Sequence, residues 1–158
     1  MPARVSTGFA SAILGSQSFE SIFNGGSIEI RTGTQPDNAD MPVTGTVIAR
    51  VTRDGGAWAA GSLANGLQFT RSGRYAMKPY DHVWQLKGSA SGVAGWFRLV
   101  GNAPDDGSAS LSLPRIDGTV RLDESVGDGQ LILITTNLDA STTIAIDNWW
   151  YAIPPIGD

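Results

Sequence analysis

The chain has one histidine and no cysteine, which limits the chemistry that its side chains can perform. His82 stands next to Asp81 in the segment YDHVW, so a base and a carboxylate are adjacent in sequence. Neighbouring residues of a strand point to opposite faces, and this spacing does not favour a hydrogen-bonded dyad. Zinc sites and catalytic triads need further ligands or partners. We therefore expect His82 to be a surface or edge residue, with no metal centre and no triad.

Carboxylates are the other candidates, because a pair of them can hydrolyse a glycosidic bond. They gather in the segments PDDGS and DESVGDG, as Asp105, Asp106, Asp123, Glu124 and Asp128. Gly, Ser or Pro flanks them, and Asp in such segments hydrogen-bonds its own backbone in turns. Turn formation explains these residues without catalysis, so a glycan hydrolase using Asp105 or Asp123 is a minor alternative. Calcium could bind here, but DESVGDG lacks the register and terminal Glu of an EF-hand, and we predict no cofactor.

Composition and charge exclude several classes of partner. The glycine-rich segments match neither a P-loop nor a dinucleotide-binding motif. A net charge of −4 opposes binding to nucleic acid. No apolar run is long enough for a membrane helix, and the N-terminal segment lacks the apolar core of a signal peptide. We therefore expect neither a nucleic-acid nor a membrane partner.

A basic and aromatic segment, SGRYAMKPY, is the best candidate contact loop. It carries Arg74, Tyr75, Lys78 and Tyr80, and Arg71 precedes it. Such a loop suits an acidic partner, and the alternative is a solvated turn between strands. Only 16% of all residues are charged, below the usual quarter, which favours a surface partly covered by neighbours.

The segment DNWWYAIPP places Trp149 directly before Trp150. On a strand the two rings face opposite ways, so one can enter the core while the other needs a cover. Exposed aromatic rings suit carbohydrate stacking or a subunit interface. We favour the interface, because the low charge content points the same way.

Residues 6–23 are expected to be helical. Phe9, Ile13 and Phe19 recur at near-helical spacing, and the following NGG is a strong stop. Gly15 weakens the middle, so two short helices are the alternative. The helix either lies across one end of a sheet or forms an arm that docks on another subunit.

From residue 27 onward the pattern changes to the alternation of short strands. The loop 34–45 and several turns separate the strands expected within residues 27–33, 46–53, 66–77, 82–90, 94–101, 111–122, 129–139 and 142–153. This spacing predicts an all-β fold, an antiparallel β-sandwich or jelly-roll-like structure with a short N-terminal helix. The domains are a helical arm at 1–26, one β-sandwich domain at 27–153 and a tail at 154–158.

The segment AGWFRLVG, residues 94–101, is interpreted as a central strand. Trp96 and Arg98 share one face, Phe97 occupies the other, and Gly95 permits close backbone approach or a bulge. Arg98 should lie along Trp96 or pair with an acidic group. The predicted core residues are Ile28, Ile30, Trp84, Trp96, Phe97, Leu99, Ile132 and Ile134.

Three segments in order, GGSIEIRTGTQPDNAD, TGTVIARVT and GVAGWFRLV, resemble small β-rich virion structural proteins of tailed bacteriophages. In that group a short N-terminal helix precedes a strand ending in TG-x-x-P, and a strand carrying G-W-F-R follows. The resemblance covers roughly residues 8–135, and the matching residues are Gly33, Pro36, Gly95, Trp96, Phe97 and Arg98. The C-terminal DNWWYAIPPIGD departs from the plainer last strand of that group.

The resemblance implies a non-enzymatic virion component that is assembled in the host cytoplasm. The first hypothesis is a capsid decoration or cement protein that binds the major capsid protein, or other virion proteins, and stabilises the shell. We expect a homo-oligomer, with a trimer as the first choice. The alternative is a tail, baseplate or fibre component that binds glycans.

The expected contacts come from the N-terminal helix, the loop 34–45 and the strand with two tryptophans. Deleting residues 1–24 is expected to abolish particle binding and to leave the β body folded. The predicted interface residues are Phe9, Ile13, Phe19, Pro36, Arg74, Tyr75, Lys78, Tyr80, Trp149 and Trp150.

Overall fold

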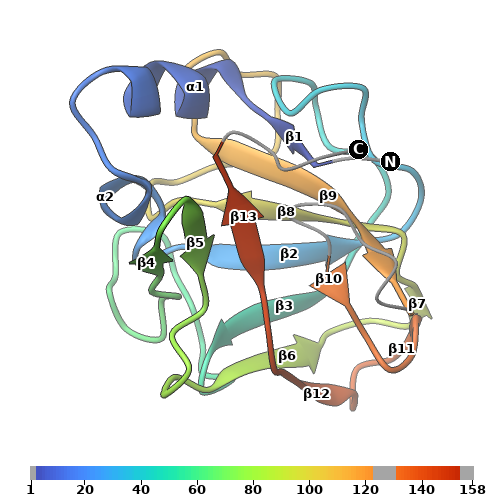
Figure 1. Cartoon of the computed structure of the whole chain (residues 1–158). Coiled ribbons are helices and arrows are strands. Elements are labelled where there is room, and N and C mark those ends of the chain that lie inside the picture. The colour runs from blue at the N-terminus through green and yellow to red at the C-terminus, as the bar shows by residue number, and fades with distance from the viewer. Residues whose placement is uncertain (1–2, 123–130, 154–158) are drawn as a thin grey trace.

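The computed structural model describes residues 3–122 and 131–153 and is mostly β, with two short helices near the N-terminus (Figure 1). The helices are α1 (Thr7–Leu14) and α2 (Phe19–Phe23). The strands are β1 (Arg4–Val5), β2 (Ser27–Arg31), β3 (Val47–Arg53), β4 (Thr70–Ser72), β5 (Tyr75–Met77), β6 (Trp84–Gly88), β7 (Gly92–Val93), β8 (Trp96–Val100), β9 (Arg115–Arg121), β10 (Leu131–Ile132), β11 (Asn137–Leu138), β12 (Thr143–Ile146) and β13 (Trp150–Ala152).

The main sheet has eight strands, seven of them in the order β1-β9-β8-β2-β3-β6-β12. Its pairs are antiparallel except that β10 runs parallel to β9. A three-stranded sheet, β13-β5-β4, lies in front of the main sheet in Figure 1, and β11 pairs with β7. The mostly β, antiparallel architecture is as predicted, and the sheets do not close into a barrel.

One face of the main sheet is apolar and forms the core. The strand register sets one buried residue from each of six strands side by side, in the order Ile116, Leu99, Ile28, Val51, Leu86 and Ile144. An aromatic cluster covers this face, made of Phe9, Phe19, Phe23, Phe69, Trp84, Trp149 and Tyr151. The alternation read from the sequence therefore corresponds to the two faces of the central strands, and β8 is buried on both of them.

The two helices belong to this core. Ser6 caps α1 by accepting the Phe9 N–H, Ser18 caps α2, and the chain breaks between them at Gly15. The rings of Phe9 and Phe19 are 5.7 Å apart and are 2% and 7% exposed. Removal of one buried phenylalanine typically costs about 3–5 kcal/mol. The expected separable arm is therefore wrong, and deleting residues 1–24 would remove part of the core.

The opposite face of the same sheet carries a row of charged residues. Successive strand neighbours across the sheet are Asp117, Arg98, Glu29, Arg50 and Lys87. Arg98 donates from Nε and Nη2 to the two carboxylate oxygens of Asp117, at 2.7 and 2.8 Å. The guanidinium of Arg50 lies 3.0 Å from Glu29. The signs alternate from Asp117 to Arg50, which lets these four side chains lie side by side on one face, while the exposed Lys87 repeats the positive sign of Arg50.

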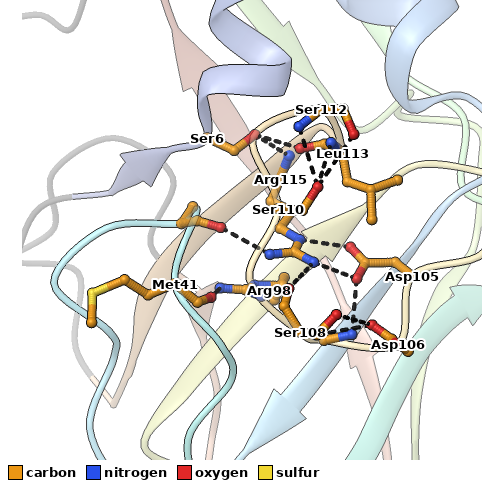
Figure 2. Close-up of polar contacts among 12 residues, drawn as sticks. Ser6, Met41, Arg98, Asp105, Asp106, Ser108, Ser110, Ser112, Leu113 and Arg115 are labelled. Atoms are coloured by element: carbon orange, nitrogen blue, oxygen red, sulfur yellow. Dashed lines mark hydrogen bonds and ion pairs between the residues drawn. The ribbon is translucent and has the colours of Figure 1, made fainter.

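Arg98 and Asp117 are buried, and Figure 2 shows Met41 from a covering loop beside Arg98 and Asp105 from another beside Arg115. Arg98 also donates to the Met41 carbonyl, and its guanidinium carbon lies 5.5 Å from the Trp96 ring centre. The acidic partner predicted for Arg98 is therefore confirmed, and the contact with Trp96 is present, but the expectation that Arg98 extends outward along that ring is wrong because its side chain is 1% exposed. Arg115 is bound by both oxygens of Asp105, at 2.7 and 2.6 Å.

Gly95 permits the close backbone approach that its position predicted. Its N–H donates to the Arg31 carbonyl at 2.8 Å, and a Cβ atom there would collide with the Gly33 carbonyl oxygen. Gly33 itself has a φ of 84°, which favours glycine. The two glycines are distant in sequence and in contact in the fold.

The segment 129–139 differs from its predicted buried strand. Leu131 and Leu133 point inward, whereas Ile132 and Ile134 are 37% and 87% exposed, so the prediction of these two isoleucines as core is wrong. The reason is that β10 lies at the end of β9 and has only one covered face. Within the described part of this segment, residues 131–139, only the short strands β10 and β11 form, and residues 111–114 precede β9 without forming a strand.

We expect Asp117→Ala to lower the free energy of unfolding by roughly 3–5 kcal/mol, because Arg98 would remain buried without its counter-charge. The matched control is Asp37→Ala, whose carboxylate is 91% exposed and 3.6 Å from Arg4, and which should cost less than about 1 kcal/mol. Urea unfolding of both variants measures the difference. Equal effects of the two substitutions would contradict the role of the buried pair.

Candidate interaction surface

The three-stranded sheet brings two of the predicted contact segments together. β5 pairs with β13 so that Met77 lies opposite Trp150 and Tyr75 opposite Ala152. β4 and β5 form a hairpin that turns at Gly73, where φ is 60°. The basic loop and the tryptophan strand, which the sequence offered as separate candidates, therefore form one surface.

The outer side of this sheet is aromatic. The rings of Tyr75 and Trp150 are 5.4 Å apart and nearly perpendicular, at 88°. With Met77 and Ser72 they line a hollow of about 380 Å³. All three large side chains are half-buried, so part of each ring or thioether meets solvent.

A second hollow, of about 480 Å³, adjoins the first at Tyr75. It lies between the hairpin and the helices, and its lining includes Ile13, Arg71, Arg74 and Ile153. We call the two hollows together the hairpin surface, and its large or charged side chains include Ile13, Glu20, Arg71, Arg74, Tyr75, Met77, Trp150 and Ile153. The sequence analysis did not predict Met77 or Ile153 as surface residues. Met77 could have been predicted, because on a strand it shares one face with Tyr75.

The hairpin surface carries more positive than negative charge in a chain whose net charge is −4, with Arg71 and Arg74 against the half-buried Glu20. Arg71 and Arg74 are exposed, and Lys78 follows on the same segment. Within residues 3–122 and 131–153, no carboxylate lies within ion-pair distance of these three cations. Aromatic rings and arginine are the residue types enriched at protein interfaces.

The remaining predicted interface residues lie in different places. Tyr80 is 97% exposed beyond the end of β5. Trp149 is 2% exposed and packs on Phe69, with ring centres 5.6 Å apart, so its assignment to an interface is wrong. Phe9 and Phe19 are also buried in the core, as described above. Pro36 is buried away from the hairpin surface, and its carbonyl accepts a hydrogen bond from Arg4.

Two of the candidate catalytic groups, Asp105 and Asp106, have structural partners. Asp105 is held by Arg115, and Asp106 accepts hydrogen bonds from the backbone and hydroxyl of Ser108. These hydrogen bonds lower the pKa of Asp106. Asp123, Glu124 and Asp128 lie outside the described residues. His82 makes no hydrogen bond through Nδ1 in the part of the chain that the structure describes.

The described residues contain no group of three or more His, Asp or Glu side chains that could hold a metal ion. Neither α1 nor α2 has the length and apolar character needed to cross a membrane, and the described part of the chain contains no other α-helix. Comparisons of the chain with protein-family models, with curated proteins and with solved structures find no match. The functional argument therefore starts from the hairpin surface.

The two adjacent tryptophans should respond differently to truncation. Trp149→Ala should lower the free energy of unfolding by about 3–5 kcal/mol, because it leaves a cavity in the aromatic cluster. Trp150→Ala should cost roughly 0.5–1.5 kcal/mol, the range of one edge-to-face aromatic contact. Thermal and urea unfolding compare the two variants. If Trp150→Ala lowered the free energy of unfolding more than Trp149→Ala, the result would contradict the burial of Trp149 in the core.

Proposed function

We propose that this chain is a non-enzymatic virion structural protein of a tailed bacteriophage. Its role is that of a capsid decoration or cement protein, which docks on the major capsid protein through the hairpin surface. The observation that carries this proposal is the combination of half-buried aromatic rings, which partly meet solvent, with cations that lack acidic partners within ion-pair distance in the described chain. Another protein that binds there would cover the rings and supply acidic partners for the cations.

The positions of the motif residues support the proposed relationship to virion proteins. Gly33 and Gly95 come from the two motifs, TG-x-x-P and G-W-F-R, and their backbones touch. Arg98 reaches the Met41 carbonyl in the loop that follows the first motif. The shared residues therefore act together as a structural unit, which is a physical reason for them to occur as a set. We also infer that the small sheet on the apolar face makes a β-sandwich, of jelly-roll-like type.

The chemistry of the surface defines the partner. Tyr75 and Trp150 would be the anchors, since aromatic side chains in fitted pockets dominate interface energies. Arg71 and Arg74 would face acidic groups on the shell and would favour the docked orientation. Stable interfaces bury roughly 800 Å² on each partner. Because the hairpin surface is only one patch, several linked copies, as in a trimer, would raise the overall affinity.

Stabilisation of the shell follows from mass action. A protein that binds the assembled shell, and not its separated subunits, adds its binding free energy to the assembled state. The chain would be made and assembled in the host cytoplasm and would reside in the virion. The alternative, a tail, baseplate or fibre component that binds glycans, predicts a different copy number.

Quantitative mass spectrometry of purified particles tests the position. A copy number comparable to that of the major capsid protein is expected for decoration of the lattice. A small symmetric multiple, of about three or six, would instead support the tail or baseplate. Absence of the chain from particles would refute the virion proposal.

Binding to particles that lack this chain tests the surface. We expect Trp150→Ala and Arg74→Glu each to weaken binding by about tenfold or more, which is typical of an interface hot spot. Lys87→Glu is the matched control, because it makes the same charge change on an exposed side chain of β6. Cosedimentation with the particles measures the dissociation constants. Normal binding of both hairpin variants would rule out the hairpin surface as the docking site.

A further inference from the structure

A third hollow lies over the charged face of the main sheet, opposite the face that the small sheet covers. Its volume is about 300 Å³, and its lining includes Glu29, Arg50, Trp58, Pro104 and Asp106. We call it the Trp58 hollow. Shell docking through the hairpin surface does not use it, so its function is a separate question.

The Trp58 hollow is built from fixed parts. The indole N–H of Trp58 donates to the Gly25 carbonyl at 2.7 Å, and the Arg50 guanidinium carbon lies 4.9 Å from the ring centre. Asn102 donates to the carbonyls of Gly25 and Ser62, both at 2.8 Å, and so ties together the two loops that form the walls. A site that is already ordered loses little conformational entropy when a ligand binds.

The charges at the hollow are largely neutralised. Glu29 lies 3.0 Å from Arg50 and 3.1 Å from Arg31, and Asp105 is bound by Arg115. Asp106 is the exposed carboxylate at the rim, where Ser108 bonds only its Oδ1 oxygen. An anionic ligand would therefore gain little from Arg50 and would be repelled by Asp106.

The remaining surface is amphipathic. Trp58, Pro104 and Val100 offer apolar contact, while Asp106 accepts and Arg50 donates hydrogen bonds. A sugar ring has the matching chemistry, with an apolar C–H face and hydroxyl groups around its edge. The volume is at the lower end of ligand pockets, which suits one ring rather than an extended chain.

We propose that the Trp58 hollow binds one neutral sugar unit, with the ring against Trp58 and a hydroxyl group donating to Asp106. This site lies on the opposite side of the main sheet from the tryptophans that the sequence offered for glycan stacking. A docked particle protein could thus keep the hollow available to a glycan.

Titration of the isotope-labelled full chain with D-glucose, D-galactose and N-acetylglucosamine, followed by NMR, tests the proposal. We expect at least one sugar to shift the indole N–H signal of Trp58, which the variant Trp58→Phe identifies by its disappearance. Trp58→Ala and Asp106→Ala should each raise the dissociation constant of that sugar by roughly tenfold or more. The second variant lies at the exposed rim and tests the site even if the first fails to fold.

The control is Trp150→Ala, which removes the half-buried ring of the hairpin surface and should bind the sugar normally. Loss of binding in Trp150→Ala alone would move the glycan site to the hairpin surface and overturn the proposal. No response to any of the three sugars at concentrations well above millimolar would also overturn it. Particle binding is measured separately, so failure here is distinguishable from failure of the docking proposal.

Discussion

The buried pair of Arg98 and Asp117 is the interaction on which the charged face depends. The two side chains are 1% and 0% exposed and share two hydrogen bonds. Burial raises the pKa of Asp117, and the hydrogen bonds from Arg98 act in the opposite direction. Each charge is tolerated inside the protein only because the other is present. The covering loop near Met41, which accepts from the same guanidinium, is thereby tied to the sheet.

The same sheet separates two kinds of surface. Its apolar face holds the aromatic cluster, and this cluster positions the small sheet so that Trp150 and Tyr75 reach solvent. Its charged face holds the paired groups that form the floor of the Trp58 hollow. The proposed shell docking and the proposed sugar binding would use opposite sides of this division, so neither partner would cover the residues that bind the other.

The candidate surface was only partly predictable from sequence. The composition of residues 70–80 and the doubled tryptophan indicated contact segments, because cations and large rings without local partners are unusual in an acidic chain. Their union on one sheet was not predictable, since β5 and β13 are far apart in sequence. The Trp58 hollow gave no sequence signal, because its lining comes from β2, β3, β8 and two loops.

The sequence alone established the mostly β class and the position of the central strands, and it limited Gly95 to a close approach or a bulge and Arg98 to a contact along Trp96 or an acidic partner. These properties follow from local alternation, from the absence of a Cβ atom and from the cost of burying a charge. Tertiary structure decided that Asp117 is that partner, that Trp149 rather than Trp150 lies inside, and that Ile132 and Ile134 face outward. Alternation sets two side chains on opposite faces, but only the packing of distant segments determines which face is covered.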